Sequence, residues 1–121
     1  MSRVSARDKL LKAAGELFYD HGITATGVDA VITRAGVAKM SLYNNFKSKS
    51  ELIAAYIDAR HQEWLDLFAR RSDNLSNGWE RVLAVFDAYQ DHAEFDYQNG
   101  FRGCGLLNAA AEMPADSAER E

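Results

Sequence analysis

The stretch DAVITRAGVAKMSLYNNFKSK, residues 29–49, decides the fold of this chain. It begins with an apolar helical turn around Val31 and Ile32, and a Gly36-Val37 corner then interrupts the helical pattern. A second short helical segment follows and ends near Phe46. Two short helices joined through a glycine are typical of the helix-turn-helix, whose second helix enters the major groove of DNA. The stretch therefore predicts a helix-turn-helix, with residues 39–45 as its second helix.

The order of residues from Ala35 to Lys49 makes this prediction more specific. It reads Ala-Gly-Val-x-Lys-x-Ser-Leu-Tyr-x-x-Phe-x-Ser-Lys, which closely resembles the signature of TetR-type transcriptional regulators. The resemblance implies an all-α fold, in which a three-helix DNA-binding head precedes a helical regulatory domain. It also implies a repressor that occupies a double-stranded DNA operator and responds to a small-molecule effector.

Composition and charge fit a DNA-binding head on an acidic body. The chain has 121 residues, 47% of them apolar, which is enough for one domain core without a metal ion or disulfide. Residues 1–50 carry eight Lys and Arg against four Asp and Glu, whereas residues 51–121 carry six against fourteen. This imbalance is expected where only the first part meets polyanionic DNA, although chance fluctuation gives the same pattern.

Cysteine content and hydropathy favour a cytoplasmic protein. Cys104 is the single cysteine in the sequence, so no intrachain disulfide forms, which suits a reducing compartment. The N-terminus does not read as a signal peptide, and no apolar run is long enough to span a bilayer. We expect a soluble cytoplasmic protein with no membrane partner.

Apolar spacing and capping residues predict six helices. The first is expected over residues 5–20, the second up to residue 35 with Thr26 as its N-cap, and the third over residues 39–45. Ser48 and Glu51 form a Ser-x-x-Glu capping box at the start of a long fourth helix. A polar break over residues 72–78 precedes the fifth helix, and the sixth runs over residues 105–113 and ends at Pro114.

The chain is expected to divide into a DNA-binding domain, residues 1–49, and a partial effector-binding and dimerisation domain, residues 50–121. TetR-type proteins usually continue through several further helices, the last two of which build the dimer interface. Here the sequence stops after the expected sixth helix, which predicts a truncated regulatory domain. Because the fourth to sixth helices then expose apolar positions, we expect a homodimer through a non-standard contact of these helices, or an aggregation-prone monomer.

The outer face of the helix over residues 39–45 is expected to read DNA bases. Leu42 and Phe46 point together toward the first helix, which leaves the opposite face for the major groove. Asn suits adenine, Lys suits guanine and Met suits a thymine methyl group, although a merely solvated face is the alternative. The predicted base-reading residues are Lys39, Met40, Ser41 and Asn44.

A second set of residues is expected to contact the phosphate backbone. Tyr43 and Lys49 match positions where TetR-type relatives commonly touch phosphate, and a phenol hydroxyl and an ammonium both suit an anion. Thr26 and the amide of Gly27 lie at a helix N-terminus, which attracts anions, and Asn45 flanks the reading face. Simple capping by Thr26 and an ordinary solvated Lys49 are the alternatives.

Two residues weaken this pattern. Ala38 occupies the N-cap of the reading helix, where relatives often have Ser or Thr, so a capping bond worth ~1 kcal/mol is expected to be missing. Asp29 lies near the expected DNA backbone, where it either repels phosphate or pairs with Arg34.

Catalysis, metal binding and cofactor binding find no support in the sequence. His21, His61 and His92 lie far apart, and Cys104 has no CxxC or Cys-His companion. The glycines fit no phosphate-cradling motif. We expect no enzyme activity, no metal site and no cofactor.

An aromatic set in the second half is the predicted effector pocket, since the corresponding domain of TetR-type relatives holds a cavity. Core packing explains the same spacing, and the cysteine of the set is either a thiol sensor or a small buried residue. The set comprises Trp64, Phe68, Trp79, Phe86, Tyr89, Phe101 and Cys104. The remaining alternative for the whole chain is a truncated helical interaction or remnant protein that no longer binds operator or effector.

Overall fold

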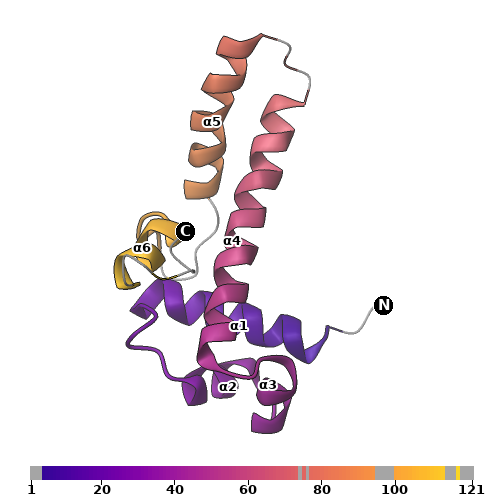
Figure 1. Ribbon diagram of the computed structural model, residues 1–121, viewed down its shortest axis with the longest axis vertical. Coiled ribbons are helices and arrows are strands. Elements are labelled where there is room, and N and C mark those ends of the chain that lie inside the picture. The colour runs from indigo at the N-terminus through magenta and orange to yellow at the C-terminus, as the bar shows by residue number, and fades with distance from the viewer. Residues whose placement is uncertain (1–3, 74, 76, 95–99, 114–116, 118–121) are drawn as a thin grey trace.

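The computed structural model of the chain describes residues 4–73, 75, 77–94, 100–113 and 117, and these ranges contain six helices and no strand. The helices are α1 (Ala6–His21), α2 (Val28–Ala35), α3 (Lys39–Asn45), α4 (Lys49–Ser72), α5 (Gly78–Ala93) and α6 (Gly105–Glu112). In Figure 1, α4 and α5 stand side by side as an antiparallel pair, α1 crosses the foot of α4, and α2 and α3 lie below it. The predicted all-α fold is confirmed, and Pro114 lies outside the described residues.

Capping residues lie at the start of α4 and at the end of α2, as predicted. The Ser48 hydroxyl caps α4 by accepting a hydrogen bond from the amide of Glu51, at 3.2 Å. The Glu51 carboxylate in turn accepts from the amide of Lys47, one residue before the N-cap. Gly36 ends α2 in the left-handed conformation (φ +68°), which glycine adopts without strain, and its amide donates to the Ile32 carbonyl at 3.0 Å.

One apolar core joins α1, α3 and the first turns of α4. Leu10, Leu42 and Leu52, one from each of these helices, are fully buried. Further along, the rings of Phe18 in α1 and Tyr56 in α4 pack edge to face, with centroids 5.3 Å apart. Because this core continues across residue 49, the division of the chain at that residue stays a prediction.

The fifth helix buries its small residues and exposes its large ones. Ala84, Ala88 and His92 lie one helical turn apart and are almost fully buried where α5 packs on α4. An ion pair of 2.7 Å between Arg71 and Asp91 also joins the two helices. The large side chains on the other side of α5 are 45–69% exposed, namely Trp79, Val82, Leu83, Phe86 and Tyr89. Core packing, the alternative interpretation of the aromatic set, is therefore wrong for Trp79, Phe86 and Tyr89, because α4 covers the opposite, alanine-containing side of α5.

The substitution Leu42→Ala is expected to lower the free energy of unfolding by about 2–5 kcal/mol, because it leaves a cavity in the shared core. Leu107→Ala is the matched control, since Leu107 is 70% exposed, and it should change that free energy by less than about 0.5 kcal/mol. Urea denaturation followed by circular dichroism measures both variants. Equal effects of the two substitutions would contradict the position of Leu42 in the core.

Candidate nucleic-acid interface

The inner face of α3 fixes this short helix against α1. Leu42 is fully buried and Phe46, the C-cap of α3, is 3% exposed, as the sequence predicts. The guanidinium of Arg7 in α1 lies over the Phe46 ring, 4.9 Å from its centroid. The N-cap residue Ala38 makes no side-chain hydrogen bond, also as predicted. Tertiary packing, not capping, therefore holds α3 in place.

The outer face of α3 is open. Met40 is 69% exposed, and Asn44, one turn further along the same side, is also exposed. Tyr43 is 41% exposed, Lys39 is exposed and Ser41 is half-buried. Exposure of a methionine side chain to water does not stabilise the fold. Beside an amide and a phenol, however, it forms a face that offers both apolar and hydrogen-bonding contacts to base edges.

Charges beside this face differ from the expected arrangement. The Lys39 ammonium lies 3.8 Å from the Asp29 carboxylate, and both side chains are more than half exposed. Arg34 binds Glu16 of α1, with 3.0 Å between Nε and Oε2. The predicted pairing of Asp29 with Arg34 is therefore wrong. The Asp29–Lys39 pair is too exposed to hold Lys39 firmly.

Two of the predicted phosphate-binding side chains donate hydrogen bonds inside the protein. The Asn45 amide donates to the Ser41 carbonyl at 2.7 Å, within α3. The Lys49 ammonium donates to the Ile23 carbonyl at 2.9 Å, which ties the start of α4 to the α1–α2 loop. An ammonium has three donors, so this bond leaves Lys49 two for another acceptor.

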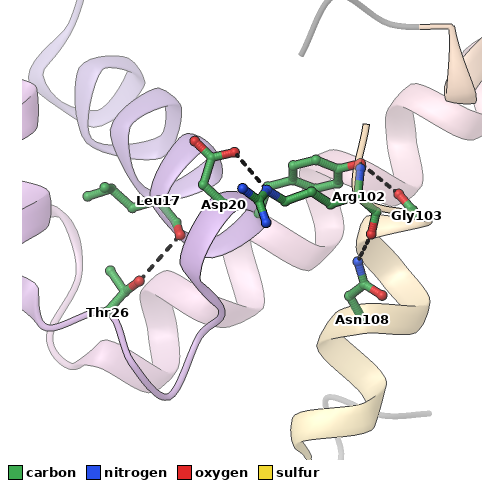
Figure 2. A network of polar contacts seen from close by, with 7 residues as sticks. Leu17, Asp20, Thr26, Arg102, Gly103 and Asn108 are labelled. Atoms are coloured by element: carbon green, nitrogen blue, oxygen red, sulfur yellow. Dashed lines mark hydrogen bonds and ion pairs between the residues drawn. The ribbon is translucent and has the colours of Figure 1, made fainter. Parts of the chain in front are cut away.

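Thr26 does not serve the role predicted for it. Thr26 is 4% exposed, and its hydroxyl donates to the Gly22 carbonyl at 2.7 Å. A longer contact of 3.4 Å joins the same hydroxyl to the Leu17 carbonyl (Figure 2). The N-cap of α2 is Gly27, which offers no side-chain cap. Thr26 is therefore neither the N-cap nor a hydroxyl donor to phosphate. The exposed first turn of α2 keeps only its backbone amides for an anion.

No pattern in the sequence predicts the contact between α6 and the loop that leads into the helix-turn-helix. The Glu112 carboxylate accepts hydrogen bonds from the amides of Ile23 and Thr24, both at 2.8 Å. Partial burial raises the pKa of Glu112, but the bonds from Thr24 and Ile23 and the nearby charge of Lys49 outweigh it and hold the pKa below its ordinary value. These partners lie 88 and 89 residues apart, beyond the reach of any local pattern.

A second group of bonds fixes the segment before α6 to the last turn of α1. The Tyr19 hydroxyl donates to the Gly103 carbonyl at 2.8 Å and accepts from the Arg102 amide at 2.6 Å. The Arg102 guanidinium lies 3.9 Å from the almost buried carboxylate of Asp20, and the Asn108 amide donates to the Arg102 carbonyl (Figure 2). Together with the bonds of Glu112, these bonds connect α6 and the segment before it to α1 and to the loop that follows α1.

The predicted effector-pocket residues divide between a ring cluster on α4 and α5 and more exposed positions. Trp64 stacks on Phe68 at 5.4 Å and packs on Tyr89 at 5.3 Å, measured between ring centroids. Trp79, Phe86, Tyr89 and Phe101 are more than half exposed, and Cys104 is half-buried at the N-cap of α6. The effector pocket of Trp64, Phe68, Trp79, Phe86, Tyr89, Phe101 and Cys104 therefore stays a prediction.

Within the described ranges, no group of three or more His, Cys, Asp and Glu residues could hold a metal ion. His92 is 4% exposed and its Nε2 lies 3.2 Å from the Glu63 carboxylate, which makes it a packing residue of the α4–α5 pair. None of the helices in the described part of the chain is long and apolar enough to cross a membrane.

Comparison with known proteins places this architecture among bacterial regulators. The family model described as "Bacterial regulatory proteins, tetR family" matches residues 10–56, which cover α2, α3 and the parts of α1 and α4 that pack on them. A TetR-family transcriptional regulator from Streptomyces coelicolor, SCO4454, superposes with a TM-score of 0.82 and 32% identity. That match covers 95% of this chain and 60% of the other.

Curated relatives are similar over the same region and beyond. The HTH-type transcriptional activator FasR of Mycolicibacterium smegmatis is 38% identical over 103 residues, which are 84% of this chain and 46% of FasR. The HTH-type transcriptional repressor KstR2 of Mycobacterium tuberculosis is 35% identical over 96 residues, or 73% of this chain and 46% of KstR2. The chain thus spans about half the length of the curated relatives it matches.

Stability is expected to depend on pH through Glu112. Because its pKa is lowered in the folded protein, Glu112 stabilises the fold above its ordinary pKa of 4.5, and this contribution is lost as the pH falls through the folded value. The stability difference between the wild type and Glu112→Gln should therefore be largest near pH 7 and narrow below about pH 4.5. Urea denaturation at several pH values measures it, with the exposed Glu80→Gln as control. A difference that stays constant with pH would contradict the contact.

Proposed function

The chain belongs to the TetR family of bacterial regulatory proteins, and from this premise we propose that it is a sequence-specific DNA-binding transcriptional regulator. The observation that carries the proposal is the division of α3 into two faces. Leu42 and Phe46 fix the inner face, while Met40, Tyr43 and Asn44 are exposed on the outer one. A helix held from one side presents the other side chains at a fixed spacing, as binding in a major groove requires. We assign the chain no enzymatic activity.

The proposed roles follow the exposure of the side chains. Bases are read by the outer residues of α3, where amide, ammonium and thioether groups reach base edges: Lys39, Met40, Ser41 and Asn44. Phosphates are contacted by the Gly27 amide, Tyr43, Asn45 and the two donors that Lys49 keeps free of Ile23. Thr26 takes no part, because its hydroxyl is used within the protein.

We propose that the regulator acts as a repressor that releases its operator when an effector binds. Occupation of a promoter by the protein blocks transcription directly, and any ligand that changes the position of the α1–α2 loop changes that of α2 and α3. The contact of Glu112 with Ile23 and Thr24 supplies the connection from α6 to this loop. A ligand acts through this contact only if it binds the protein more tightly with α6 in one position than in another.

The exposed face of α5 supports a homodimer through helices α4 to α6. Trp79, Phe86 and Tyr89 are 52–69% exposed, while the opposite side of the same helix is buried by α4. A contiguous apolar face of this kind drives association. A twofold dimer buries the same face on both subunits and presents two reading helices to half-sites about 34–36 Å apart.

Asn44→Ala is expected to cost about 1–3 kcal/mol of discrimination at one base pair, because the amide is the group best suited to adenine. An operator is first selected from a random DNA pool, and affinities for single-base variants are then measured by fluorescence anisotropy across a salt series. Lys49→Ala is the matched variant, and it should weaken all sequences alike and lower the salt slope by about one. If both variants bind every sequence as the wild type does, α3 does not read this DNA.

Phe86→Lys is expected to shift the protein from dimer to monomer, since a charge in the centre of the apolar face opposes its burial. Ala30→Lys adds the same charge at an exposed position of α2, outside helices α4 to α6, and should leave the dimer intact. Sedimentation velocity over a range of concentrations gives the mass of each species. A wild-type protein that stays a thermally stable monomer at high concentration would exclude this interface.

A further inference from the structure

A cavity of about 170 Å³ lies where α1, α4 and α6 meet, outside the predicted effector pocket. Its floor is apolar and aromatic, since Phe18, Tyr56 and Ala109 are each 3–4% exposed. Protein interiors contain few voids larger than a water molecule, and an apolar cavity of about 150 Å³ is known to bind benzene. The space is therefore suited to the apolar body of a benzene-sized molecule.

Two glycines keep this cavity open. A Cβ atom at Gly105 would lie 3.1 Å from the Tyr56 hydroxyl oxygen, and one at Gly22 would lie 3.3 Å from the Glu112 carboxylate. Both glycines line the cavity, so a side chain at either position would meet its walls. Gly22 also has φ +89°, which other residues rarely adopt. The two glycines thus leave space that the Cβ atoms of other residues would occupy.

Two side chains at the exposed rim of the cavity offer acceptors. Asn108 donates one N–H of its side-chain amide to the Arg102 carbonyl at 2.9 Å, which leaves its Oδ1 as an acceptor and its second N–H as a donor. Each Glu112 carboxylate oxygen accepts one backbone amide, and the Thr24 side chain also hydrogen-bonds this carboxylate. A carboxylate has about four lone-pair sites, so Glu112 keeps acceptor capacity for one further donor. Glu112 is exposed, and the bonds that lower its pKa keep it charged at neutral pH. Two cations lie near the cavity. Lys49 is bonded to the Ile23 carbonyl, and Arg60, whose Nε would lie 3.2 Å from a Cβ at Gly105, is paired with the Glu63 carboxylate at 2.9 Å.

We propose that this junction cavity binds a small organic ammonium ion, with its benzene-sized body on the aromatic floor and its head at Glu112 and Asn108. An ammonium carries three donors and no acceptor, which suits the Glu112 carboxylate and the Asn108 Oδ1, and its charge is opposite to that of Glu112. An anionic head of the same size meets like charge at the same carboxylate. The site is thus selective for the sign of the head group.

The position of the cavity gives such a ligand access to the helix-turn-helix. Ile23, which lines the cavity, is also the residue whose amide binds Glu112. An ammonium at Glu112 shares the carboxylate with the amides of the α1–α2 loop and weakens its bonds to them, so ligand binding and DNA binding are coupled in both directions. Only this consequence rests on the proposed function, since binding to the cavity is measured without DNA.

Calorimetric titration of the full chain with benzylammonium, at constant ionic strength, tests the site. We expect saturable binding of one ion per chain with a dissociation constant on the order of millimolar, and at least tenfold weaker binding of benzoate. Benzoate has the same ring and the opposite charge, so it controls for hydrophobic association. Equal affinities, or an absence of saturation by benzylammonium, would overturn the proposal.

Two substitutions locate the binding. Ala109→Leu fills the floor and should abolish benzylammonium binding, provided that circular dichroism shows an intact fold. Glu112→Gln removes the rim charge, so it should weaken benzylammonium binding at least fivefold and should not weaken benzoate binding. Glu80→Gln, an equal charge change on α5, should change neither affinity. A folded Ala109→Leu variant, or Glu112→Gln, that binds benzylammonium as the wild type does would refute the site. Loss of DNA binding alone would leave these titrations unchanged.

Discussion

The packing of α1 against α2, α3 and α4, together with its bonds to the segment before α6, is the constraint on which the structure depends. At its start and middle, Leu10 and Ala14 are fully buried in the core that holds α3. Near its end, Phe18 meets Tyr56 of α4 edge to face, an arrangement worth about 0.5–1.5 kcal/mol beyond the area that it buries. In the next position, the Tyr19 hydroxyl bonds the segment before α6. The first part of α1 therefore packs against the head, and its last turn contacts the body.

Features with a local cause could be predicted from the sequence. The capping of α4 by Ser48 and the end of α2 at Gly36 each depend on a few neighbouring residues, and the structure has both. The inward direction of Leu42 and Phe46 follows from helical spacing and the single apolar side of a short helix. For the same reason the outward direction of Met40 and Asn44 could be predicted, although what they bind could not.

Features that depend on which segments meet could not be predicted. Thr26 has the side chain of an N-cap, but the path of the loop brings the Gly22 carbonyl within 2.7 Å of its hydroxyl. α5 has large apolar residues on one side and alanines on the other, and only the position of α4 determines that Ala84 and Ala88 are buried. The bonds of Tyr19 and Glu112 join residues 83 to 89 apart, so no helical period or motif marks them.

The backbone of Ile23 takes part in two hydrogen bonds that connect the body to the head. Its carbonyl accepts from the Lys49 ammonium of α4, and its amide donates to the Glu112 carboxylate of α6. Side chains of opposite charge thus hold the two polar ends of one residue, whose own side chain is 4% exposed in the core. Charge-assisted hydrogen bonds are stronger than neutral ones, so this loop is fixed more firmly than its exposed neighbours. Because α2 begins five residues later, the orientation of the helix-turn-helix depends on both α4 and α6, and a change at either is felt by the reading helix.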